Sequence, residues 1–102
     1  MKKDTKSNIS SRVVEKEVIP GLKLFSLKTE AKRIVTIEGS LLGGSHHGTN
    51  KNWMLAEIVA EMLDQGTKKY GKTELHDLLE ERGISIDWGV SRFFLHFSAR
   101  CL

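Results

Sequence analysis

The chain has 102 residues, of which 39% are hydrophobic and 28% are charged. These values are those of an ordinary folded domain, and the length suffices for one core but not for two. The composition therefore argues against a disordered chain. No run of eighteen apolar residues is present, and no apolar segment follows the basic start, which argues against a transmembrane helix and a secretory signal.

The net charge of +3 lies in the first twelve residues, where Lys2, Lys3, Lys6 and Arg12 outnumber Asp4. The rest of the chain is neutral. We expect a flexible basic tail over residues 1–11 and one folded domain over residues 12–102. A nucleic-acid-binding domain carries its basic excess on the folded surface, so we expect neither nucleic acid nor a membrane as partner. The alternative is binding of either one through the Lys-rich tail.

The single cysteine, Cys101, has no second cysteine with which to form an internal disulfide. It lies near the end of an expected strand and is most simply a small apolar residue. A lone cysteine suits a reducing compartment, so we expect a cytoplasmic location.

The first third of the chain predicts three strands. Residues 12–19 and 22–27 form a hairpin around Pro20-Gly21, because proline presets one turn dihedral and glycine accepts a positive one. A polar turn over 28–32 leads to a strand over 33–42. Apolar residues share one face of that strand, and Gly39 lies in the same row, where its missing side chain permits close packing.

The remaining chain predicts two helices and two more strands. A Gly-rich loop over 43–48 precedes a helix that we expect to begin at a cap on Thr49 or Asn50 and to run to about Gln65, with Gly66 as its stop. A second helix, capped by Thr73, runs to about Arg82. Strands follow over 84–88 and 93–101, each with apolar residues at alternate positions.

The resulting order, β-β-β-α-α-β-β, predicts an α+β fold in which two helices cover one face of an antiparallel sheet. The chain stops in or just after its last strand, and no closing helix follows. We therefore expect a poorly covered sheet edge and a partial or truncated domain.

The first helix carries the clearest motif. Leu55-Ala56 precede the segment Glu57-Ile58-Val59-Ala60-Glu61, and Met62-Leu63 and Gly66-Thr67 follow it. This frame resembles the first helix of the insulinase-type (pitrilysin, inverzincin) zinc metallopeptidases, which carry His-x-x-Glu-His there. The Pro20-Gly21-Leu22 turn and the strand that ends in Gly43-Gly44-Ser45 also resemble that family. The resemblance covers about residues 12–102.

The resemblance implies zinc as cofactor and peptide hydrolysis in active members of the family, but this sequence departs from the motif at every defining position. Glu57 and Glu61 stand at the two histidine positions, and Ala60 stands at the position of the glutamate that takes the proton of the zinc-bound water. The family's third ligand would lie beyond Leu102. We therefore expect no cofactor and a non-catalytic, peptidase-like domain. In the family, such inactive domains pair with active ones, which makes a homologous peptidase subunit or a second domain the expected partner.

A rebuilt metal site is the alternative. Glu57 and Glu61 lie four residues apart on one helix face, and either His46 or His47 could complete a Glu–Glu–His set for a metal-dependent hydrolase. A solvated stripe of Glu57, Glu61 and Asp64 opposite the apolar face is the simpler interpretation. His76 and His96 we expect to be an exposed residue and an ordinary sheet residue. Ser40 and Ser45 lack the G-x-S-x-G motif of a nucleophile.

Overall fold

The computed structural model describes residues 8–102, and the predicted positions 1–7 of the basic tail lie outside this part. Its regular elements confirm the α+β class and the predicted order of strands and helices. The strands are β1 (Val13–Ile19), β2 (Leu22–Leu27), β3 (Val35–Leu42), β4 (Ser85–Val90) and β5 (Phe94–Cys101), and the helices are α1 (Leu55–Met62) and α2 (Lys72–Glu81). Short 3-10 helices occupy Ile9–Arg12 and Ser45–His47.

The chain divides into two compact units, and the division in the sequence falls between Lys32 and Arg33. This division follows the strand pairing, since β1 and β2 form a two-stranded sheet of their own and β3, β4 and β5 form another. The boundary after residue 11 and the single domain over 12–102 stay a prediction. Arg33 at the start of the second unit has a positive φ of 61°, which is uncommon for a residue with a side chain.

The first unit is the predicted hairpin. Val13 pairs with Leu27 and Ile19 with Leu22, with one irregularity between Glu17 and Ile19. Gly21 has a φ of 85°, which confirms its role in the turn. The guanidinium of Arg12 donates to the Lys28 carbonyl oxygen at 2.8 Å, so the two ends of the hairpin are joined. The 3-10 helix over Ile9–Arg12 replaces the last part of the expected tail.

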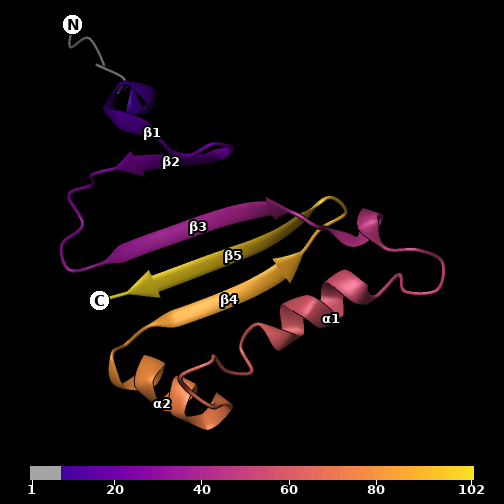
Figure 1. Ribbon diagram of the computed structural model, residues 1–102. Helices are drawn as coiled ribbons and strands as arrows, with labels where there is room; N and C mark the ends of the chain where they lie inside the picture. Colours follow the sequence, from indigo (N-terminus) through magenta and orange to yellow (C-terminus); the bar gives the residue numbers. More distant parts are fainter. Residues whose placement is uncertain (1–7) are drawn as a thin grey trace, which may run out of the picture. The chain divides into compact units, whose positions relative to one another are not determined.

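The second unit is a three-stranded antiparallel sheet in which β5 lies between β3 and β4 (Figure 1). The register places the apolar residues of the three strands in common rows. Ile37, Ala99 and Ile86 share one row, and Gly39, Phe97 and Trp88 share the next. The predicted alternation of apolar residues is therefore correct, and one face of this sheet is apolar throughout.

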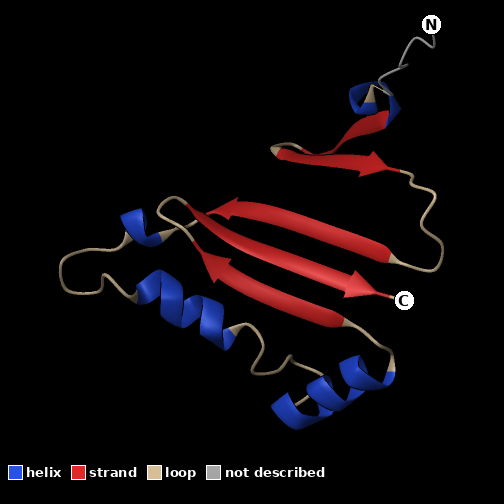
Figure 2. Cartoon of the chain, turned by 180° about the vertical axis from the view of Figure 1, so that it is seen from behind, coloured by secondary structure: helices blue, strands red, loops and turns tan. Residues whose placement is uncertain are grey.

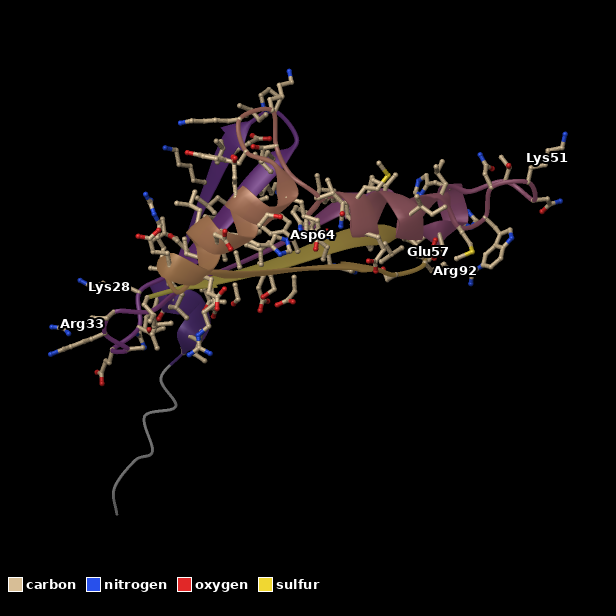
Figure 3. All side chains as sticks on the ribbon, turned by 90° about the horizontal axis from the view of Figure 1, so that it is seen from below. Lys28, Arg33, Lys51, Glu57, Asp64 and Arg92 are labelled. Carbon is tan, nitrogen blue, oxygen red and sulfur yellow. The ribbon has the colours of Figure 1, made fainter. Side chains whose placement is uncertain are left out.

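Both helices lie on one side of the three-stranded sheet, as predicted (Figure 3). They run beside the β4 edge, with α2 at the end of the sheet where β4 begins (Figure 2). This placement covers the apolar face unevenly. Leu95, Phe97 and Trp88 are half-buried, whereas Val35, Ile37 and Leu41 of β3 are 50–53% exposed.

The ends of the helices differ from the prediction. α1 begins at Leu55 with Met54 as its N-cap, whereas the predicted cap was Thr49 or Asn50. The Thr49 N–H donates to the side chain of Asn52, and this local turn competes with helix formation. α1 ends at Met62 rather than near Gln65. α2 begins after Gly71 rather than at Thr73, and Gly83, with a φ of 62°, follows its end as predicted.

Candidate site on the first helix

Ala60 is the most deeply placed side chain of α1. It is 7% exposed and is the only buried hydrophobic side chain among residues 8–102. A methyl group can neither accept nor donate a proton, and at this depth it is shielded from solvent. The position that resembles the catalytic glutamate of the insulinase-type peptidases therefore contributes packing, not acid–base chemistry.

Glu57, at the first histidine position, is only half-exposed, and its Oε2 atom is buried without a hydrogen-bond donor from the described residues. It projects from the first turn of α1 at the end of the unit where Arg92 also lies (Figure 3). Glu61, one turn later, is exposed. The expected solvated stripe is thus correct for Glu61, while the Glu57 carboxylate is partly withdrawn from water.

His46 and His47 belong to the 3-10 helix Ser45–His47, which precedes α1. The ring of His46 packs edge-on against Phe93, with ring centroids 5.2 Å apart. In the part of the chain that the structure describes, no three side chains of the types His, Cys, Asp and Glu gather closely enough to hold a metal ion. Glu57, Glu61 and His46 therefore do not form an assembled ligand set.

The residues on α1 do not fit the zinc centre that the resemblance implies. Such a centre takes three protein ligands and leaves one position open for water. Here the three motif positions hold two carboxylates of different exposure and one buried methyl group. No catalytic step can be assigned to a metal at these positions.

A second polar cluster lies on the opposite face of the three-stranded sheet. His96 is hydrogen-bonded to two serines, with 2.9 Å between Ser40 Oγ and Nδ1 and 3.0 Å between Nε2 and Ser91 Oγ. The Ser91 hydroxyl also lies 3.3 Å from the Phe94 carbonyl oxygen, to which it donates. In a neutral imidazole, Nε2–H then donates to Ser91 and Nδ1 accepts the Ser40 proton.

The sequence missed this cluster because Ser40 and His96 are 56 positions apart. The alternation of side chains correctly placed His96 on the other face of the sheet from Phe97. Only the β3–β5 register pairs Ser40 with His96. Ser91 joins through the β4–β5 turn. A serine that donates to an imidazole resembles a nucleophile–base pair, yet no carboxylate of residues 8–102 hydrogen-bonds to the His96 ring, whose nitrogens contact the two serines. The arrangement joins the central strand to an edge strand and to the turn.

The structure also brings Asp64 and His76 together. The His76 Nε2–H donates to the Asp64 carbonyl oxygen at 3.1 Å, and Nε2 lies 3.9 Å from Asp64 Oδ2. The sequence treated the two residues separately, as part of a surface stripe and as an exposed histidine. Asp64 lies in the segment that follows α1 and His76 lies in α2, and no spacing along the chain predicts their contact.

No protein-family model matches the chain, and no curated protein matches it. Within residues 8–102, no helix combines the length and apolar character needed to cross a membrane.

Proposed function

We propose that the chain is a non-catalytic, insulinase-type peptidase-like domain that acts by binding a homologous peptidase subunit. The observation that carries this proposal is the burial of Ala60 at the position of the catalytic glutamate, between Glu57 and Glu61 at the positions of the metal ligands. A helix that keeps the apolar frame of the motif and loses its chemistry is suited to packing, not to hydrolysis.

The amount of exposed surface supports a binding role. Several large apolar side chains of the second unit are exposed. Val35, Ile37 and Leu41 form a continuous row on β3, and Ile58 and Met62 of α1 are 51% and 63% exposed. Exposed apolar residues that share one strand face favour contact with another protein.

The binding experiment mixes the purified chain with an active insulinase-type peptidase from the same source and measures the mass of the mixture by light scattering after size exclusion. We expect a complex that the variant Ile37→Lys abolishes, because the lysine places a charge in the apolar row. Thr36→Lys is the matched control, since Thr36 neighbours Ile37 on the other face of β3 and its substitution should leave the complex intact. Equal binding by both variants would contradict the proposal that the peptidase subunit binds to the apolar row of β3.

The catalytic half of the proposal is tested by titration calorimetry with zinc and manganese. We expect no stoichiometric heat of binding, and the same result for the double variant Glu57→Gln/Glu61→Gln. Tight binding of one ion per chain, lost in the double variant, would instead establish the rebuilt metal site of a hydrolase.

A further inference from the structure

A cavity of about 550 Å³ lies between α2, the segment that follows α1 and strand β4. Its walls are apolar and include Leu75, Leu79, Ile84 and the indole ring of Trp88. These four side chains are half-buried, so the cavity opens to solvent and is not a closed packing defect. Its volume is in the range of pockets that bind small organic molecules, about 300–1,000 Å³.

The polar lining of this cavity is acidic. Asp64 and Glu80 contribute carboxylates, and His76 is the one basic group among its lining residues. With both carboxylates ionised, the lining is negative whether the imidazole is neutral or charged. No lysine or arginine of the described part of the chain contributes to the lining.

Only one oxygen of the Asp64 carboxylate accepts a hydrogen bond from the described residues. Its Oδ1 atom accepts a hydrogen bond from the Gln65 amide at 2.8 Å. Its Oδ2 atom lies 3.9 Å from His76 Nε2, which is too long for a hydrogen bond, because that N–H donates to the Asp64 carbonyl oxygen instead. Asp64 lies between α1 and α2, above the sheet (Figure 3). Oδ2 can therefore accept a hydrogen bond from a ligand without the loss of an existing one.

We propose that this cavity binds a small molecule with an aromatic or branched apolar body and a single ammonium group. The body lies against Trp88 and the leucines of α2, and the ammonium group lies at Asp64 Oδ2 with Glu80 nearby. Apolar contact supplies most of the affinity, since burial of apolar surface is the main favourable term and the carboxylates are partly exposed. The carboxylates supply the preference for a cation over an anion. This proposal does not rest on the peptidase-like function.

Tryptophan fluorescence gives a direct test, because the chain has two tryptophans and only Trp88 lines the cavity. The variant Trp53→Phe removes the other tryptophan, which is 63% exposed, and leaves Trp88 as the sole reporter. The probes are 2-phenylethylammonium and 3-phenylpropionate, which share the aromatic ring and differ in the sign of the charge. We expect saturable quenching or a spectral shift with the cation at an affinity about fivefold above that of the anion.

Two further variants in the Trp53→Phe background locate the site. Asp64→Asn should remove most of the preference for the cation while it retains binding of the ring, and Leu79→Arg should abolish binding of both probes. Lys51→Gln lies outside the cavity and is the control for a general charge effect. The proposal is overturned by the absence of saturable binding in the Trp53→Phe chain, by equal affinity for the two probes, or by an unchanged preference in Asp64→Asn. Circular dichroism of each variant separates loss of binding from loss of the fold.

Discussion

The aromatic ring of Phe97 occupies the space in which a side chain at Gly39 would lie. The two residues are paired across β3 and β5 on the apolar face of the sheet. The ring also lies 5.7 Å, between centroids, from that of Trp88 on β4. Because Gly39 has no side chain, the Phe97 ring can lie over β3 while it also packs beside Trp88 of β4. The sequence predicted such close packing at this glycine.

This relationship predicts that Gly39→Ala destabilises the second unit by about 1–3 kcal/mol, because the new methyl group displaces the Phe97 ring. Gly89→Ala is the matched control, since Gly89 is also in a strand of this sheet but has open space around it. The control should be neutral or stabilise by about 0.5 kcal/mol. Urea unfolding followed by circular dichroism measures both. Equal effects of the two substitutions would contradict the close contact with Phe97.

The burial of Ala60 predicts that Ala60→Glu destabilises the fold without creating a peptidase. A carboxylate at this depth costs about 3 kcal/mol, since it loses water and gains no partner. The exposed neighbour Glu61 provides the control, because Glu61→Ala should change the free energy of unfolding by no more than about 0.5 kcal/mol. Thermal unfolding gives the stabilities, and a quenched peptide substrate reports cleavage. A stable Ala60→Glu variant would show that the helix can accept a carboxylate at this position.

The buried oxygen of Glu57 predicts a gain in stability when the carboxylate is removed. An unpaired buried polar atom costs about 1–3 kcal/mol, whereas a negative charge in the first helical turn contributes about 0.3–1 kcal/mol. The first effect is larger, so Glu57→Met should raise the free energy of unfolding by about 1 kcal/mol. Glu61→Met tests the same exchange at an exposed site and should have little effect. A loss of stability in Glu57→Met would indicate that a donor reaches this carboxylate in solution.

The hydrogen bonds of His96 predict one neutral tautomer, with the proton on Nε2. Nitrogen NMR of the imidazole ring distinguishes the two forms directly. Ser40→Ala removes the donor to Nδ1 and should cost about 1 kcal/mol while the Nε2–H tautomer persists. Ser91→Ala removes the acceptor of Nε2–H and should shift the tautomer population instead. A proton found on Nδ1 in the unmodified chain would reverse the assigned direction of both hydrogen bonds.

Much of the fold follows from local patterns. The alternation of Ile84, Ile86 and Trp88, and of Leu95, Phe97 and Ala99, predicted both the strands and the face that each residue joins, because side chains in a strand alternate strictly. Pro20-Gly21 and Gly83 marked a turn and a helix end through their backbone preferences. The start of α1 was wrong, since Thr49 and Asn52 bond to each other, and propensity alone does not distinguish a cap from a competing turn.

The sequence predicted less of the candidate site on α1 than of the fold. The identities of Glu57, Ala60 and Glu61 excluded an intact zinc motif, but their spacing could not show that the Ala60 methyl group and one Glu57 oxygen are buried while Glu61 remains exposed. That distinction depends on which side of the helix meets the sheet. The division of the chain after Lys32 was equally hidden, because strand pairing is a non-local property.

By itself, then, the sequence determined the class of the fold and the order of its elements, both of which depend on residue types and on neighbours a few positions away. Only the tertiary structure decided the pairing of Ser40 with His96, the contact of Asp64 with His76 and the cavity beside Trp88. These features join residues that are 12 to 56 positions apart. The physical reason is that register and helix packing, which bring such residues together, are set by burial over the whole unit rather than by any local preference.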